Sequence, residues 1–385
     1  MSTPSTTDTA TGGARLPLRR GLEGLTPYGA PQLDVPVLLN VNENPYPPSE
    51  AVVAEIADAV AKAAHGLNRY PDRDFPELRA ELAEYLQVES GVALGAEQIW
   101  AANGSNEVML HVLQAFGGPD RSVLSFAPTY SMYPEYARDT LTEWVAGRRE
   151  EDFTLDVDHV RAQIAEHRPA VILLASPNNP TGTALPLDTI EAVCDAAAGA
   201  GPSGSDGAPT DAVVVVDEAY GEFRREGVAS ALTLLDRYPH LAVSRTMSKA
   251  FGMAGLRLGY LAATTQLVDH LRVVRLPYHL SAVTQAAALA ALRHRAELMS
   301  QVASLRAERD ALVTWLRGRG LTVADSDANF VLFGLFDDRH EVWNGLLERG
   351  VLIREVGPEG WLRVSVGTPQ ETAAFRAALE EVLGR

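Results

Sequence analysis

Short apolar runs alternate with stretches of helical period over most of the chain, and this alternation limits the possible folds more than any other feature. The runs are rich in valine, isoleucine, leucine and alanine, and they cover Ile99–Ala102, Val123–Phe126, Val171–Ala175, Val213–Val216 and Leu241–Ser244. Such runs are typical of parallel strands that helices cover on both faces. Helix-like segments lie between most of them, at Glu107–Phe116, Leu155–Glu166 and Leu187–Ala198. The pattern predicts an α/β fold with a large, doubly wound, mostly parallel sheet.

The pattern changes after about residue 282. One long helical stretch is expected there, at Val283–Arg317. Two strands are expected at Ala328–Phe333 and Leu362–Val366, and two further helices at Arg339–Glu348 and Pro369–Leu383. A chain of 385 residues has room for two domains. We therefore expect a disordered tail at 1–13, an N-terminal arm at 14–45 that belongs to the small domain, a large domain at 46–282 and a smaller α+β domain at 283–385.

Charge and cysteine content exclude several classes of protein. The net charge of −17 argues against nucleic-acid binding, which needs clustered cations. The single cysteine, Cys194, excludes an intramolecular disulfide and a cysteine-rich metal site, and its helical context predicts a small buried residue. No apolar run is long enough for a membrane span, and Met1–Gly13 lacks the apolar segment of a signal peptide. We expect a cytoplasmic protein, with Gly199–Thr210 as a mobile surface loop.

Polar clusters directly follow four of the predicted strands. They are Asn103–Glu107, Ser176–Gly182, Asp217–Tyr220 and Arg245–Lys249. Ligands of doubly wound sheets bind at the carboxyl ends of the strands, so four clusters at four such ends should converge on one crevice. The sequence therefore predicts a single site at this edge of the sheet.

The residue types in these clusters point to pyridoxal phosphate. The chain has no GxxxxGK[ST], HExxH or GxSxG motif, and its nine histidines show no ligand-like spacing, so no metal site is expected. Asp217 follows one strand and Lys249 follows the next. Pyridoxal phosphate needs a lysine amine for its aldehyde, a carboxylate for its ring nitrogen, and amides, hydroxyls and an arginine for its phosphate.

Longer strings around these residues resemble a known superfamily. Ser248–Tyr260 is similar to the lysine motif of the fold-type I aminotransferases, and Ser176–Gly182 and Asp217–Phe223 are similar to two other signatures of that superfamily, in the expected order. Further strings resemble the histidinol-phosphate aminotransferase family, at Leu39–Pro48, Arg69–Asp72, Pro128–Tyr130 and Leu362–Thr368. The resemblance spans Leu25 to the C-terminus and implies a fold-type I architecture, with a large sheet domain and a smaller α+β domain.

The resemblance implies transamination between glutamate/2-oxoglutarate and histidinol phosphate/imidazole-acetol phosphate, in histidine biosynthesis. An aromatic amino-acid aminotransferase on the same scaffold is the main alternative, and a phosphothreonine-type decarboxylase is a more distant one. A pyridoxal phosphate-sensing regulator would need a DNA-binding domain, which about 13 tail residues cannot form.

The resemblance also implies roles for residues around the cofactor ring. Lys249 would bind the aldehyde and later carry the proton, and Asp217 would pair with the ring nitrogen. Asn179 and Tyr220 would bond to the phenolic oxygen, while Tyr130 would stack on the ring.

Another set would hold the cofactor phosphate. It comprises Ser105 and Asn106 at a helix start together with Thr246, Ser248 and Arg257. Tyr70 would reach the phosphate from the partner subunit, so the resemblance implies a homodimer with shared sites.

The anionic group of either substrate would lie against arginines. Arg363 is expected to bind it in a bidentate manner, with Arg354 and Tyr28 in the same pocket. Asn44 and Asn329 are weaker candidates for substrate binding.

Overall fold

The structure is a computed structural model, and it describes residues 16–384. The chain divides into two units, of which the second begins at Leu33. Within the first unit, Arg20–Leu22 forms a short 3-10 helix, η1. The tail expected at 1–13 lies outside the described residues.

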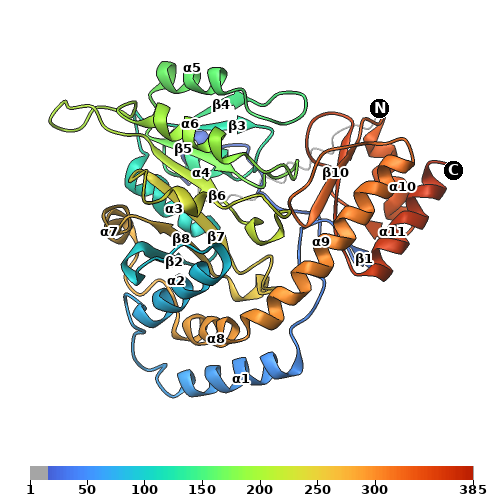
Figure 1. Cartoon of the computed structure of the whole chain (residues 1–385), viewed down its shortest axis with the longest axis horizontal. Coiled ribbons are helices and arrows are strands. Elements are labelled where there is room, and N and C mark those ends of the chain that lie inside the picture. The colour runs from blue at the N-terminus through green and yellow to red at the C-terminus, as the bar shows by residue number, and fades with distance from the viewer. Residues whose placement is uncertain (1–15, 385) are drawn as a thin grey trace. The chain divides into compact units, whose positions relative to one another are not determined.

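A seven-stranded sheet forms the centre of the second unit, with the strand order β2-β8-β7-β6-β5-β3-β4 (Figure 1). Its strands are β2 (Ile99–Ala102), β3 (Ser122–Ala127), β4 (Glu143–Arg148), β5 (Val171–Ala175), β6 (Val213–Asp217), β7 (Leu241–Thr246) and β8 (Gly259–Ala263). Only β8 pairs antiparallel with its neighbours, β2 and β7. Every residue of β2, β5, β6, β7 and β8 is buried, which requires cover on both faces. The α/β prediction is confirmed.

Helices pack around this sheet. They are α1 (Glu50–Ala64), α2 (Pro76–Ser90), α3 (Ser105–Phe116), α4 (Tyr133–Asp139), α5 (Val157–His167), α6 (Leu187–Ala197), α7 (Thr265–Val274) and α8 (Ala282–Arg293). The sequence explains several starts: Ser49 accepts a hydrogen bond from the Val52 N–H, and α2 begins with a proline, which needs no N–H partner there. Short 3-10 helices η2 to η5 occur in the connections, at Ala96–Gln98, Gly221–Phe223, Ala231–Leu234 and Ala254–Leu256.

The C-terminal segment builds a second apolar core. A three-stranded sheet, β12-β10-β9, contributes Trp361–Ser365, Phe330–Gly334 and Thr322–Val323. Helices α10 (Arg339–Glu348) and α11 (Pro369–Val382) pack together, and α11 starts at a capping box between Thr368 and Glu371. Strand β1 (Val37–Leu38) pairs in parallel with β11 (Val351–Leu352), so Leu39 joins this core. The domain boundaries expected from the sequence stay a prediction.

Helix α9 (Arg295–Gly318) runs through both cores. Leu298 belongs to the core around the seven-stranded sheet, whereas Leu312 and Leu316 belong to the C-terminal core. The long helix expected at Val283–Arg317 is in fact two helices, α8 and α9, which meet at His294. His294 leaves the helical conformation (ψ 15°) and binds Glu55 of α1 at 2.6 Å, which accounts for the break.

Three smaller observations complete the fold. Cys194 is buried in α6, as predicted, and burial raises the pKa of its thiol to about 12. The loop at 199–210 is closed by hydrogen bonds such as Gly201 N–H to Thr210 O (2.8 Å). Within residues 16–384, no helix combines the length and the apolar character needed to cross a bilayer.

Candidate active site

The carboxyl ends of β6 and β7 lie side by side and carry the two residues on which the cofactor prediction depends. Asp217 is the last residue of β6, and its register partner on β7 is Ser244. Strand β7 ends at Thr246, and Lys249 follows three residues later. The sheet therefore brings the acid and the lysine to one edge.

Asp217 is buried, and its carboxylate has two hydrogen-bond donors. Tyr133 O–H donates to Oδ2 (3.2 Å) and the Ala219 N–H donates to Oδ1 (3.2 Å). Burial nevertheless dominates and raises the pKa of Asp217 to about 6. A carboxylate in this position favours a cationic partner. Tyr133 was not among the predicted site residues, although it lies three positions after Tyr130.

Lys249 is partly buried, and its amine is held by a backbone carbonyl. Its Nζ donates to Val41 O (3.0 Å) and lies 5.8 Å from the centre of the Tyr220 ring. Burial, followed by the charge of Arg363, lowers the pKa of Lys249 to about 8. A lysine with this pKa is partly neutral near physiological pH, and a neutral amine is the form that attacks carbonyl groups.

Arg363 of β12 connects the C-terminal core to the Asn179 loop. Its Nη1 donates to Asn179 Oδ1 (2.5 Å) and its Nη2 donates to Asn40 O (2.8 Å). Arg354 forms an isolated antiparallel bridge with Arg363, in which each N–H donates to the other's carbonyl at 2.9 Å. Residues directly opposite in such a pair project to the same face, so both arginine side chains leave the sheet on one side.

The two tyrosines predicted to contact the cofactor ring, Tyr220 and Tyr130, lie near residues already described. The Tyr220 hydroxyl oxygen accepts from Asn42 Nδ2 (3.0 Å), and the ring meets Phe330 edge-on at 5.0 Å. Tyr130 is half-buried and lies edge-on to Tyr133, the tyrosine that binds Asp217, at 5.7 Å. Asn40 and Asn42, which lie in the string Leu39–Pro48, were not predicted as site residues, because nothing in their types indicates the contacts they make.

The predicted phosphate-binding residues come together at the start of α3. Ser105 and Asn106 are the first two residues of that helix. Gly104 precedes them with φ 85°, and a Cβ at Gly104 would lie 2.4 Å from Arg257 Nη2. The Thr246 hydroxyl bonds to Ser248 Oγ (3.1 Å), to which Arg257 Nη1 also donates (3.4 Å). A helix start, two hydroxyls and a guanidinium form a cradle suited to an anion.

The other predicted residues are placed differently. Tyr70 is 80% exposed, and its ring stacks on Tyr278 with 4.5 Å between ring centres. Tyr28 belongs to the first unit and is half-exposed. Asn44 Nδ2 donates to Ala250 O (3.2 Å), and Asn329 Nδ2 donates to Asn42 O (3.1 Å), so both amides hold backbone segments together.

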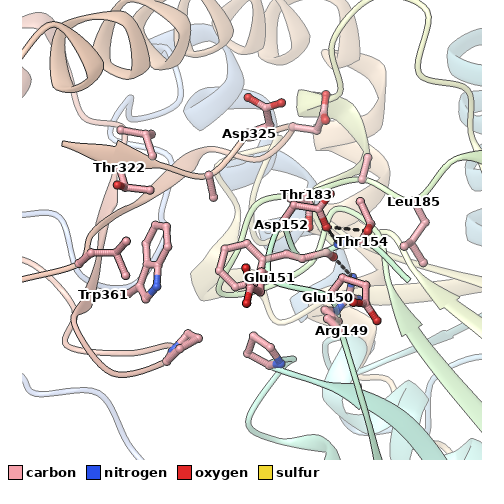
Figure 2. Close-up of a pocket in the computed structure, with 18 of the residues that line it drawn as sticks. Arg149, Glu150, Glu151, Asp152, Thr154, Thr183, Leu185, Thr322, Asp325 and Trp361 are labelled. Carbon is pink, nitrogen blue, oxygen red and sulfur yellow. Dashed lines mark hydrogen bonds between the residues drawn. The ribbon is translucent and has the colours of Figure 1, made fainter. Parts of the chain in front are cut away.

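A cavity of about 800 Å³ opens elsewhere, between the 149–154 turn and the C-terminal core (Figure 2). Phe153 and Trp361 line it, and their rings meet edge-on at 5.4 Å. Its arginines are paired within the wall, as in the ion pair between Arg225 and Asp327 (3.0 Å). Of the described residues that line it, none is a predicted site residue. The described part of the chain also contains no cluster of side chains that could hold a metal ion.

Comparison with known proteins gives a consistent result. The sequence matches the family "Aminotransferase class I and II" over residues 35–379. A protein of Burkholderia lata named histidinol-phosphate aminotransferase 3 is 61% identical over 368 residues, which is 96% of each chain. A histidinol-phosphate aminotransferase of Thermobifida fusca is 61% identical over 370 residues and again 96% of each chain is covered.

Solved structures show the same fold. The histidinol-phosphate aminotransferase of Sinorhizobium meliloti, solved in complex with pyridoxal-5'-phosphate, has a TM-score of 0.83 and 22% identity, covering 97% of this chain and 99% of that one. A putative histidinol-phosphate aminotransferase of Erwinia carotovora has a TM-score of 0.78 at 27% identity, covering 91% and 96%.

Proposed function

This chain belongs to the class I and II aminotransferases, and we infer that it is a pyridoxal phosphate-dependent histidinol-phosphate aminotransferase. It moves the amino group between glutamate/2-oxoglutarate and histidinol phosphate/imidazole-acetol phosphate in two half-reactions, a step of histidine biosynthesis. The relatives that are 61% identical carry this name, which favours it over the aromatic amino-acid aminotransferase alternative.

The described residues fit pyridoxal phosphate. When bound, this group supplies an aldehyde that an amine can attack and a protonated ring that withdraws electrons from the substrate α-carbon. Asp217 would hold the proton on the ring nitrogen, and the start of α3 with Thr246, Ser248 and Arg257 would hold the phosphate. Gly104 supports this assignment, because a Cβ there would lie 2.4 Å from Arg257 Nη2 and would displace the guanidinium from the start of α3.

Lys249 provides the amine and the proton carrier. Its lowered pKa, about 8, lets Nζ both lose and accept a proton near neutral pH. Tyr220, whose ring lies beside Nζ, and Asn179 would bond to the cofactor's phenolic oxygen, while Tyr130 would cover the ring. These assignments are proposals that the grouping of the residues supports.

Arg363 and Arg354 would bind the anionic end of the substrate. The two side chains share a face of the C-terminal sheet, and Arg363 is held in place by Asn179 and Asn40. A carboxylate has two oxygens and a phosphate three, so one arginine can bind glutamate while two suit histidinol phosphate. Asn44 and Asn329 stay weaker candidates for this pocket, and the role of Tyr28 stays a prediction.

The observation that carries the proposal is the pairing of a buried Asp217 and a partly buried Lys249 at neighbouring strand ends. Borohydride reduction of the yellow holoenzyme should add the mass of the cofactor to the peptide that contains Lys249. A Lys249→Ala protein that still retains cofactor through a reducible covalent bond would contradict the assignment. Turnover should then be compared for histidinol phosphate and phenylalanine; a preference for phenylalanine would favour the aromatic alternative.

We also propose a cytoplasmic homodimer with shared sites. The support for shared sites is Tyr70, which is exposed and stacked on Tyr278, in segments that expose further apolar side chains such as Leu276. Mixing inactive Lys249→Ala subunits with inactive Tyr70→Ala subunits should restore activity, because a mixed dimer has one intact site. Two folded variants that exchange subunits but regain no activity would refute shared sites.

A further inference from the structure

A buried group of charged residues adjoins the site and has no part in the function described so far. We call it the Arg245 cluster; it consists of Glu89, Glu218, Glu222, Arg224 and Arg245. Glu218 follows Asp217 directly, and Arg245 lies on β7 four residues before Lys249. The cluster thus supports both strand ends that carry the site.

Arg245 is the centre of the cluster. Its side chain is fully buried and contacts Glu218 (2.7 Å), Glu222 (2.9 Å) and Glu89 (3.1 Å). Arg224 adds contacts to Glu218 (2.9 Å) and Glu89 (3.0 Å). Two guanidinium groups therefore face three carboxyl groups, and one carboxyl lacks a matching positive charge. A buried uncompensated charge is costly, so one acid in such a group favours its neutral form.

Glu218 and Glu89 have the environment of ionised groups. Glu218 accepts from both arginines, from Ser230 O–H (2.7 Å) and from the Ala231 N–H (2.8 Å). Burial acts to raise the pKa of Glu218, but Arg245 and Arg224 together hold it below its ordinary value. Glu89 accepts from both arginines and is the cluster's most exposed acid, so water also solvates its charge.

Glu222 has the opposite environment. Its Oε1 accepts from Tyr85 O–H of α2 (3.1 Å) and from Arg245 of β7 (2.9 Å). Its Oε2 is buried and has no hydrogen-bond partner among the described residues. Burial raises the pKa of Glu222, with Glu89 acting in the same direction and Arg245 and Arg224 against it.

From β8, the Tyr260 hydroxyl faces the same cluster and likewise has no partner within the described chain. We propose that Glu222 carries a proton on Oε2 in the folded protein and that it acts as a neutral positioning residue. The Arg245 cluster then holds two positive and two negative charges.

The proton on Glu222 affects the pKa of Asp217. The charge of Glu218 already acts to raise the pKa of Asp217, whose ionised form is needed beside a protonated ring. With Glu222 neutral, the positive charge of Arg245 offsets Glu218 instead of being shared with a third carboxylate. Asp217 therefore stays ionised at neutral pH.

Replacement by glutamine distinguishes a neutral glutamic acid from an ionised one. Glutamine has nearly the same shape as both forms, but, like the neutral form, it carries no charge. We expect the Glu222→Gln holoenzyme at pH 7 to melt at or above the wild-type temperature. Glu218→Gln is the matched control and should melt well below it, since it removes the ionised partner of two arginines. A Glu222→Gln protein that loses as much stability as Glu218→Gln would overturn the proposal.

Infrared spectroscopy tests the proton directly and does not depend on the proposed function. At pH 8, the wild-type holoenzyme should show the carbonyl band of a protonated carboxyl group, and this band should be absent from Glu222→Gln. No difference in this band between the two proteins would overturn the proposal, even if the Glu218→Gln control does not fold.

The pH profile of transamination is the second readout, and it rests on the proposed function. Its acid limb should have the same midpoint in Glu222→Gln and wild type. A shift to lower pH in the variant would mean that a negative charge had been removed, which contradicts a neutral Glu222. If neither protein transaminates, the proposed function fails while the infrared result still decides the proton.

Discussion

Replacing Asp217 by asparagine should stabilise the cofactor-free protein at neutral pH, and it should abolish the transamination activity of the holoenzyme. Burial raises the pKa of this carboxyl group from 3.8 to about 6, although Tyr133 and the Ala219 N–H both bond to it. The folded protein therefore binds this proton more tightly than the unfolded chain does, so the stability that the proton provides is lost as the pH rises from 3.8 through about 6.

The size of the effect follows from the same numbers. Each pH unit in that window changes the free energy of unfolding by about 1.4 kcal/mol, so an ionised Asp217 lowers it by about 3 kcal/mol at neutral pH. Asparagine cannot ionise and keeps an oxygen that accepts from Tyr133. The advantage of the variant over wild type should therefore widen by about 2 kcal/mol between about pH 4.5 and pH 7.

Urea unfolding of the cofactor-free proteins, followed by tryptophan fluorescence at several pH values, measures this difference. Asp337→Asn, at an exposed aspartate of the same chain, is the matched control and should show no pH-dependent gap. Saturating pyridoxal phosphate should reduce the advantage of Asp217→Asn, because the bound cofactor stabilises the wild type more. A gap that stays constant from pH 4.5 to pH 7 would refute the reasoning.

Three further predictions concern the substrate, the pH profile and the fold. Arg354→Ala should reduce kcat/KM for histidinol phosphate about ten- to a hundredfold and for glutamate much less, since a lost charge-assisted hydrogen bond costs about 1.5 to 3 kcal/mol. Arg349→Ala, which removes an exposed arginine that contacts Glu381 and Gly345 O, is the control, and equal losses for both substrates in Arg354→Ala would exclude Arg354 from a phosphate role. Transamination should fall as the pH drops through about 6, where Asp217 gains its proton, and a profile that is flat from pH 7 to 5 would contradict this. Thr368→Ala should lower the free energy of unfolding by about 1 kcal/mol through loss of the α11 capping box, and unchanged denaturant midpoints would argue against that contribution.

The sequence predicted the part of the fold that burial dictates. Runs such as Val213–Val216 are apolar on both faces, and a strand of that kind can lie only inside a covered sheet, so the strand ends and their polar clusters followed. Strand β4 was missed because it is an edge strand with mostly exposed side chains, and β8 because its run follows the lysine motif without a break.

Part of the candidate site could not be read from residue types. The bridge between Arg354 and Arg363 depends on how β12 returns past the 353–355 segment, and no local pattern encodes that pairing. In the sequence, Tyr133 resembles an ordinary core aromatic residue. Only the folded structure shows that its hydroxyl donates to Asp217. Asn44 and Asn329 show the reverse case: their amides bind backbone carbonyls, a role that any asparagine in a turn can fill.

Helix α9 connects the two apolar cores, one at each of its ends. It is 24 residues long, and a helix of that length spans about 36 Å. A rotation of about 5° at the His294 break would move the far end, at Leu316, by about 3 Å, which exceeds the 2.5 Å between Arg363 Nη1 and Asn179 Oδ1. The contact between Glu55 and His294 thus lies at one end of α9, and the core that includes β12, the strand of Arg363, lies at the other.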